Sequence, residues 1–254
     1  MSVRRIVAPI VFLAALIALW EFYVQSGGIE SYVLPAPSDI RPEFFRMLPD
    51  LGHDIQITVF EAVTGLVLAA VTGAAFALLI AVSPATRDAV YPVLVVSQAI
   101  PALVLAPVFA VWLGFEELLP KILVVALVGF FPIVVSTVDG LVGADRERME
   151  LVQSFGASRA QVLRLVQVPS ALPGFFAGLK IAATYAVVAA VIGEWMGGSR
   201  GLGLVMTRAQ HTFRNDRVFV AVIVVAFVSL ALFALVSVLA RLATPWVTAE
   251  GDRL

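Results

Sequence analysis

Residues 118–141 read LLPKILVVALVGFFPIVVSTVDGL, a run in which Lys121 and Asp139 are the only charged residues. About 20 mostly apolar residues in a helix are enough to cross the hydrocarbon core of a membrane. Six such runs occur, at residues 6–24, 55–82, 90–113, 118–141, 172–195 and 218–239. They are continuous and lack the apolar–polar alternation of a membrane β-barrel, so they predict helices.

The overall composition agrees with this interpretation. Of 254 residues, 61% are hydrophobic and 14% are charged, whereas soluble domains are about 45–50% apolar and about 25% charged. The formal net charge of -1 argues against a nucleic-acid-binding surface. Because the chain has no cysteine, disulfides and thiolate sites are excluded. The only histidines, His53 and His211, are far apart in sequence, which disfavours a histidine-rich metal centre.

The distribution of basic residues predicts the orientation. Arg4 and Arg5 precede the first apolar run, and no A-x-A-like cleavage site follows it, so we expect an uncleaved membrane span rather than a signal peptide. With six spans, both termini lie in the cytoplasm, where the segments hold nine arginines against seven basic residues outside. Segment 197–217 weakens this bias because it places four arginines on the outer side.

A polar segment at 145–169 separates two apolar runs and carries helix start and stop signals. Asp145 is a candidate N-cap, and Gly156 can adopt the left-handed conformation that ends a helix. Ser158 followed by Gln161 fits a capping box that begins a second helix. Two short amphipathic helices joined at 156–157 are therefore predicted.

The same segment also has a predicted end and a predicted apolar face. Pro169 is expected to end the second helix. Helical spacing predicts that four apolar residues share one face: Leu151, Phe155, Val162 and Val166. Such a face rests on lipid headgroups or docks into a groove of a partner protein, and spacing leaves both alternatives open.

The segment resembles the loop of ABC importer permeases, which has the pattern EAA-x3-G-x9-I-x-L-P. Here ELVQSFG at 150–156 is followed by nine residues and then VQVP at 166–169, so Glu150, Gly156 and Pro169 occupy matching positions. In that family the loop docks onto a separate ATPase subunit. The resemblance implies that the docking residues are Glu150, Ser154, Gly156, Ala157, Ser158, Arg159 and Pro169.

Further stretches extend the resemblance from about residue 34 to 246. They are VLPAPSDI at 33–40, PALVLAPVFAVWLGF at 101–115, VGFFPIVVSTVDGL at 128–141, GLKIAATYAVVAAVIGEW at 178–195 and GLG at 201–203. They are similar to the subgroup of permeases for nitrate, sulfonates, taurine, bicarbonate, riboflavin and the pyrimidine precursor of thiamine. Glu61 departs from the basic residue expected at that position.

The resemblance implies an all-α membrane protein of six transmembrane helices with a cytoplasmic helix–turn–helix coupling loop between spans four and five. Residues 1–50 would form the first helix and an outer segment, 51–246 the permease core with the loop at 145–169, and 247–254 a cytoplasmic tail. The implied location is the bacterial inner membrane. The implied partners are two ATP-binding subunits, an outer solute-binding protein and a second permease copy, most simply in a homodimer.

Nucleotide chemistry is expected on the partner rather than on this chain. GGSRGLG at 197–203 lacks the Lys-Ser/Thr pair of a phosphate-binding loop, and no G-x-x-x-x-G-K-[ST] occurs elsewhere. We therefore interpret 197–203 as a flexible outer turn. The chain itself is expected to bind no cofactor and to have no catalytic residues or ATPase site, with ATP and magnesium held by the partner ATPase.

Five residues in or beside the apolar runs are candidates for the translocation pathway. A charge near the bilayer centre costs at least about 2.5–3.5 kcal/mol, so Glu61, Asp139 and Glu194 should face protein or water. The alternative is that they lie near span ends, solvated or paired with a neighbour. Pro101 and Pro107 should kink the third span and free carbonyl groups toward a solute, although a kink can also serve packing alone.

Two other function classes are alternatives to an importer. A self-contained secondary transporter or channel would use Glu61, Asp139 and Glu194 as an ion or proton relay, but the inverted repeats typical of such carriers are not evident. A membrane-embedded enzyme is not supported, because the sequence contains no HExxH or G-x-S-x-G motif. Within the importer hypothesis, GEW at 193–195 and FFP at 130–132 favour a heterocyclic vitamin precursor such as the pyrimidine precursor of thiamine, and the alternatives are a sulfonate, taurine, nitrate or riboflavin.

Overall fold

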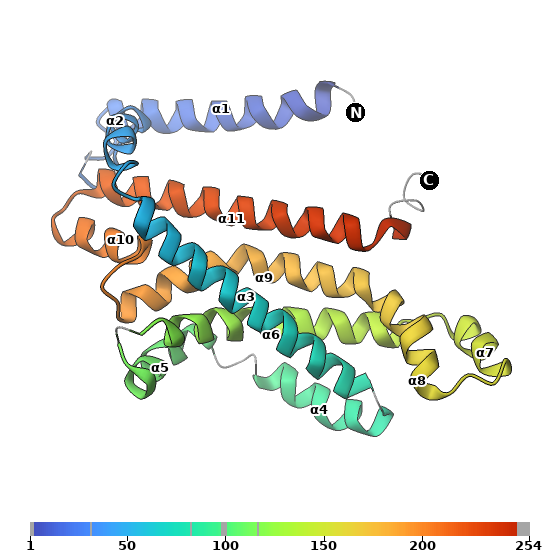
Figure 1. Cartoon of the computed structure of the whole chain (residues 1–254). Helices are drawn as coiled ribbons and strands as arrows, with labels where there is room; N and C mark the ends of the chain where they lie inside the picture. The colour runs from blue at the N-terminus through green and yellow to red at the C-terminus, as the bar shows by residue number, and fades with distance from the viewer. Residues whose placement is uncertain (1–2, 31, 82, 98–100, 116, 248–254) are drawn as a thin grey trace.

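The structure, a computed structural model, describes residues 3–30, 32–81, 83–97, 101–115 and 117–247 (Figure 1). Within these ranges every regular element is a helix, which confirms the all-α prediction. Five helices are long and apolar enough to cross a membrane. They are α1 (Val3–Gln25), α3 (Gly52–Ala81), α6 (Leu118–Val142), α9 (Val168–Met196) and α11 (Asn215–Ala243).

The predicted third span at 90–113 is wrong as a single helix. The chain instead forms α4 (Pro84–Ser97), a short 3-10 helix η1 (Ala102–Leu105) and α5 (Ala106–Leu113). Proline removes a backbone donor and disfavours helical geometry in the residue before it. Pro101 accordingly lies outside the helices and Pro107 lies in the first turn of α5. The broken segment still leads from the end of α3 to the start of α6, at opposite ends of the bundle (Figure 1).

Short helices lie at both ends of the bundle. At one end are α7 (Arg146–Ser154) and α8 (Arg159–Val162), together with the start of α1 and the end of α11 (Figure 1). At the other end are α2 (Pro37–Met47) and α10 (Leu202–His211), which the sequence analysis did not predict.

An ion-pair cluster fastens α2 to the start of α11. The buried Glu43 of α2 lies 2.8 Å from Arg217 Nε, 3.3 Å from Arg214 Nη2 and 2.7 Å from Arg46 Nη1. A buried carboxylate is stabilised only when partners satisfy it, and these three arginines do so for Glu43.

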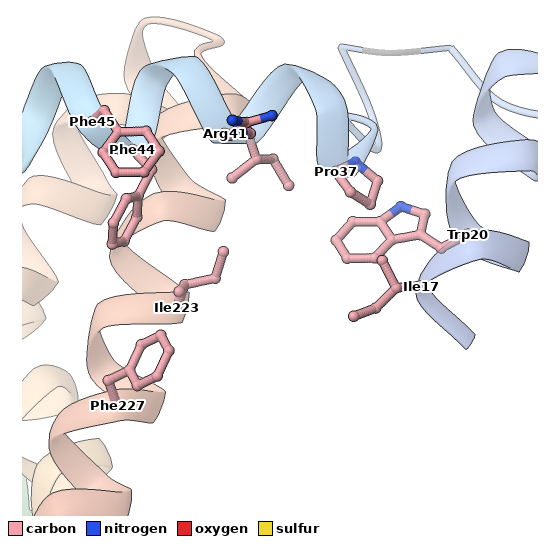
Figure 2. Close-up of a pocket in the computed structure, with 9 residues that line it drawn as sticks. Ile17, Trp20, Pro37, Arg41, Phe44, Phe45, Ile223 and Phe227 are labelled. Atoms are coloured by element: carbon pink, nitrogen blue, oxygen red, sulfur yellow. The ribbon is translucent and has the colours of Figure 1, made fainter. Parts of the chain in front are cut away.

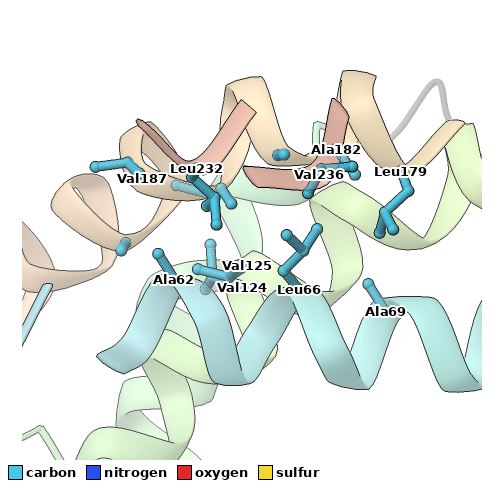
Figure 3. Close-up of a cluster of buried hydrophobic side chains, with 14 of the residues drawn as sticks. Ala62, Leu66, Ala69, Val124, Val125, Leu179, Ala182, Val187, Leu232 and Val236 are labelled. Atoms are coloured by element: carbon cyan, nitrogen blue, oxygen red, sulfur yellow. The ribbon is translucent and has the colours of Figure 1, made fainter. Parts of the chain in front are cut away.

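Helix α9 is the centre of the bundle, with contacts to α3, α6, α10 and α11. Its most extensive contact is with α6. Figure 3 shows the side chains of α3, α6, α9 and α11 meeting in one cluster. The labelled members are Ala62, Leu66, Ala69, Val124, Val125, Leu179, Ala182, Val187, Leu232 and Val236.

Glycines allow α6 and α9 to approach closely. A Cβ added at Gly178 would lie 2.8 Å from Ile133 Cα and would also collide with the carbonyl oxygen of Pro132. A Cβ at Gly174, one turn earlier, would collide with the carbonyl oxygen of Ser136. Small residues four apart are typical of helix interfaces in membranes, where close packing replaces the hydrophobic effect as the driving force.

We predict that Gly178→Ala destabilises the protein more than the same substitution at Gly52. Overpacking at rigid backbone typically costs about 1–3 kcal/mol, whereas a Cβ at Gly52 has no atom within 4 Å. Thermal unfolding of both variants in the same detergent would measure the difference. Equal melting temperatures would contradict close packing of α6 on α9.

Candidate functional site

The polar segment at 145–169 forms the predicted pair of short helices. Asp145 caps α7, since its Oδ1 accepts a hydrogen bond from the backbone N–H of Glu147 at 2.9 Å. Gly156 has φ +84°, the left-handed conformation expected after a helix end. The capping box of α8 is also present, with the Ser158 N–H donating to Gln161 Oε1 at 2.8 Å. The capping predictions for these helices are therefore confirmed.

The predicted common apolar face of these helices is wrong. Val162 and Val166 are buried at the base of the loop, but Leu151 and Phe155 are 58% and 83% exposed. The left-handed turn at Gly156 redirects the chain, so one helical repeat does not continue across it. The first helix therefore carries an exposed apolar surface, and the second is anchored to the bundle.

The predicted helix end at Pro169 is also wrong. From α8 the chain continues through a π-helical segment, η2 (Leu163–Gln167), directly into α9. Pro169 lies in the first turn of α9. A π-helical turn changes the hydrogen-bond pattern just before the proline, so the missing N–H is accommodated without ending the helix.

Most of the predicted docking residues are accessible. Glu150, Ser154, Gly156, Ser158 and Arg159 are exposed, and Ala157 and Pro169 are half-buried. Glu150 Oε1 accepts a hydrogen bond from Arg146 Nε at 2.9 Å across one helical turn. Beside them opens a groove of about 490 Å³. Its lining residues are Arg148, Leu151, Val152, Leu165, Val166, Pro169, Ser170 and Trp246.

A second group of polar side chains, most of them buried, lies at the opposite end of the bundle. Asp54, Thr58 and Glu61 follow one face of α3, at helical spacings of four and three. The Thr58 hydroxyl donates to Glu194 Oε1 of α9 at 2.6 Å and accepts from the Leu202 N–H at 3.0 Å. Thr58 and Glu194 are 0% and 1% exposed, so this contact is inside the protein.

The start of α10 completes this buried group. The Gly201 N–H donates to Asp54 Oδ1 at 2.8 Å, and the Gly203 N–H donates to Glu194 Oε2. Unpaired N–H groups and the helix dipole make a helix N-terminus favourable for carboxylates. Gly201 has φ +122°, and a Cβ there would collide with the Glu194 carboxyl group. The predicted flexible turn at 197–203 is thus packed and hydrogen bonded at 201–203, whereas Ser199 and Arg200 are exposed.

Lys121 of α6 supplies the cation of this group. Its Nζ lies 3.5 Å from Glu61 Oε1, and both side chains are almost completely buried. We call Thr58, Glu61, Lys121 and Glu194 the buried polar cluster; the half-buried Asp54 lies beside it.

The predicted pathway residues are distributed unevenly. The structure brings Glu61 and Glu194 together in the buried polar cluster, whereas Asp139, Pro101 and Pro107 are exposed and take no part in it. Asp54, Thr58 and Lys121 were missed as site residues. The signal for Asp54 and Thr58 was the helical spacing of 54, 58 and 61 on one face of a single span, whereas Lys121 lies on another helix and had no such signal.

An apolar cavity of about 500 Å³ lies apart from both groups, between α1, α2 and α11. Figure 2 shows Trp20 of α1 facing it from one side and Phe227 of α11 from the other, under α2. Arg41 is the only charged residue among the described residues that line it. A wall so apolar offers few partners to a polar solute, so we do not assign the cavity to the pathway.

We predict that Thr58→Val destabilises the protein more than Thr72→Val on the same helix. The first change removes the hydrogen-bond partner of Glu194 Oε1 and of the Leu202 N–H, at about 1–3 kcal/mol. The Thr72 hydroxyl bonds only to carbonyl groups of its own helix. Thermal unfolding in detergent would measure both variants, and an equal loss would argue against a stabilising role for the Thr58–Glu194 contact.

Curated relatives match nearly the whole chain. It is 35% identical over 243 residues to the formylaminopyrimidine transport permease protein ThiX of Halalkalibacterium halodurans, covering 94% of this chain and 95% of the relative. It is 34% identical over 238 residues to the riboflavin transport system permease protein RibX of Chloroflexus aurantiacus, covering 93% and 88%. A probable ABC transporter permease protein of Haemophilus influenzae is 33% identical over 229 residues, covering 90% and 93%.

The fold is similar to that of a solved transporter. An inward-facing structure of the MetNI methionine ABC transporter aligns with a TM-score of 0.61 and 21% identity, covering 76% of this chain and 97% of that chain. The family model for the inner membrane component of binding-protein-dependent transport systems matches residues 69–249. These matches favour an importer subunit over the self-contained carrier considered from the sequence. The chain belongs to the binding-protein-dependent transport system inner membrane component family and is a permease subunit of an ABC importer.

Proposed function

We propose that this permease forms one half of a solute pathway and receives movement from a partner ATPase through α7 and α8. The observation that carries the proposal is the division of the loop between an exposed apolar surface and a buried base. Leu151 and Phe155 are exposed, while Val162 and Val166 fix the following helix to the bundle. A partner that binds the exposed surface would thus be connected mechanically to α9.

The chemistry of the loop suits a protein partner. Exposed aromatic side chains act as anchors when they enter a pocket of a partner. Phe155 is such a side chain, and the groove of about 490 Å³ beside α7 could receive a side chain in return. The charged residues Arg146, Glu150 and Arg159 are exposed in the same loop, and polar residues of this kind form the rims of protein interfaces.

ATP hydrolysis belongs to the partner in this proposal. The sequence contains no G-x-x-x-x-G-K-[ST] motif for nucleotide phosphates. ATP and magnesium would then bind to two ATPase subunits, one for each permease copy of a homodimer. A solute-binding protein would deliver the solute at the other end of the bundle.

The arrangement of the bundle supports cytoplasmic termini. The start of α1 and the end of α11 lie toward the same end as α7 and α8 (Figure 1). An ATPase in the cytoplasm would therefore meet α7 on the side where we place both termini. The excess of arginine in these segments agrees with the positive-inside rule.

For the solute we propose a small heterocyclic vitamin precursor, such as the pyrimidine precursor of thiamine. The formylaminopyrimidine and riboflavin permeases among the relatives support this class. In importers of this type a separate binding protein makes the first selection, so the binding site for the solute is expected mainly on that partner.

We predict that Phe155→Ser weakens association with the ATPase. Removing an exposed aromatic anchor from an interface typically costs more than about 1 kcal/mol, which is at least fivefold in affinity. Copurification of a tagged ATPase with the permease would measure the loss. Phe213→Ser is the matched control, because Phe213 is 82% exposed at the opposite end of the bundle. Equal retention of the ATPase by both variants would exclude α7 as the docking surface.

We also predict that Gly156→Val abolishes uptake while Gly27→Val preserves it. Both glycines have left-handed backbones, at φ +84° and φ +79°, and neither has an atom within 4 Å of an added Cβ. The local strain should therefore be similar, at about 1–2 kcal/mol, but only Gly156 lies in the docking loop.

Uptake of labelled formylaminopyrimidine by cells that carry the complete transporter would test this pair of variants. Uptake through Gly156→Val at the wild-type rate would refute mechanical coupling through the loop. Absence of uptake by the wild type would refute the proposed solute and leave the docking test with Phe155 unaffected.

A further inference from the structure

The charges of the buried polar cluster do not balance when every group is ionised. Glu61, Lys121 and Glu194 are 0%, 3% and 1% exposed, so two carboxylates and one ammonium group would leave one negative charge inside the protein. An uncompensated buried charge is strongly destabilising. The cluster therefore needs another positive charge or a proton.

The hydrogen bonds identify which carboxyl group is suited to be ionised. Glu194 accepts hydrogen bonds on both oxygens, from the Thr58 hydroxyl and from the Gly203 N–H at the start of α10. A carboxylate accepts hydrogen bonds and donates none. Donors to both oxygens thus match an ionised Glu194.

Glu61 differs from Glu194 in the hydrogen bonds to its carboxyl group. Neither of its oxygens has a hydrogen-bond partner among the described residues, although both are buried. Its contact with Lys121 Nζ, at 3.5 Å, is longer than a good charge-assisted hydrogen bond. Glu61 lies on the same face of α3 as Thr58, whose hydroxyl is bonded to Glu194 Oε1 at 2.6 Å, so the two carboxyl groups belong to one site. A protonated Glu61 would supply the donor that this part of the cluster lacks.

The other charged groups nearby do not neutralise Glu61. On α3, Asp54 is itself acidic and accepts from the Gly201 N–H. On the loop before α10, Arg200 is exposed. Near the start of α11, Arg214 and Arg217 pair with Glu43 of α2 instead. Helix α5 carries no charged residue. Among the described residues, Lys121 is therefore the only cation that pairs with Glu61.

We propose that Glu61 is a proton-binding site: its carboxyl group holds one proton and donates a hydrogen bond to the ionised Glu194. Lys121 and Glu194 then balance each other, and the cluster is neutral. Two carboxyl groups that share one site commonly hold a proton in this way. The proton joins the ends of α3, α6, α9 and α10, so its loss loosens this end of the bundle.

The proposal has a definite pH dependence. In the unfolded chain Glu61 is exposed and ionised at neutral pH, since glutamate ordinarily titrates near about 4.3. The folded protein then binds one more proton than the unfolded chain, so its stability falls as the pH rises.

Infrared spectroscopy of the purified full-length chain in lipid nanodiscs tests the proposal. We expect the wild type to show the carbonyl band of a buried protonated carboxylic acid at neutral pH. Glu61→Gln should remove the band and remain folded, because the amide replaces a neutral group of similar shape. Asp50→Asn, at an exposed position outside the cluster, is the matched control and should retain the band.

The unfolding equilibrium provides a second measurement. A single extra proton in the folded state changes the unfolding constant roughly tenfold per pH unit, and Glu61→Gln should remove this dependence while Asp50→Asn keeps it. Absence of the band from the wild type, or its survival in Glu61→Gln, overturns the proposal. If Glu61→Gln does not fold, the wild-type band and its loss on alkaline titration still decide the question.

Discussion

In a membrane, helices gain little from excluding lipid, so their association depends on how closely the backbones approach. This constraint is met along α9, where Gly174 and Gly178 allow the backbone of α6 to lie directly against it. Buried alanines continue the same surface toward the other end of the helix: Ala182, Ala183, Ala186 and Ala190. The contacts of α3 and α11 with α9 are built around this central pair of helices.

Polar contacts then fix the parts of the chain that small-residue packing does not reach. Glu43 joins α2 to the beginning of α11 through Arg214 and Arg217. Glu194 and Asp54 bind the N-terminus of α10 and hold the preceding glycine-rich turn against α3. In surroundings of low dielectric such contacts are costly when incomplete, so each one selects a single arrangement of the elements it joins. Both sets lie at the end of the bundle opposite α7 and α8.

Sequence patterns predicted features that depend on neighbouring residues and missed those that depend on distant ones. The lengths of the apolar runs were sufficient to predict the long helices. The helix caps at Asp145 and Ser158 could be predicted from the residues next to them. The contact of Glu61 with Lys121 joins two helices, so no local sequence spacing predicts it. Helical periodicity did not predict which residues after Gly156 are buried, because a residue with a left-handed backbone changes the direction of the chain and so the face that the next helix buries. Pro169 was misread because a π-helical turn before it kept the helix continuous.

That continuity joins the base of the loop to the far end of the bundle through one run of helical backbone, residues 159–196, which is 38 residues long and bends where α8 meets α9 (Figure 1). Its length along the backbone is roughly 57 Å at about 1.5 Å per residue. Val162 lies near one end of this run and Glu194 near the other, so under the proposed function a displacement of the loop would be passed to the far end of α9. Inside this run, the π-helical turn at 163–167 and Pro173 both depart from regular α-helical hydrogen bonding, so a displacement passed along the run would bend it there first. Under the proposed function, movement of the loop would therefore reach Glu194 through the backbone of one continuous helical run.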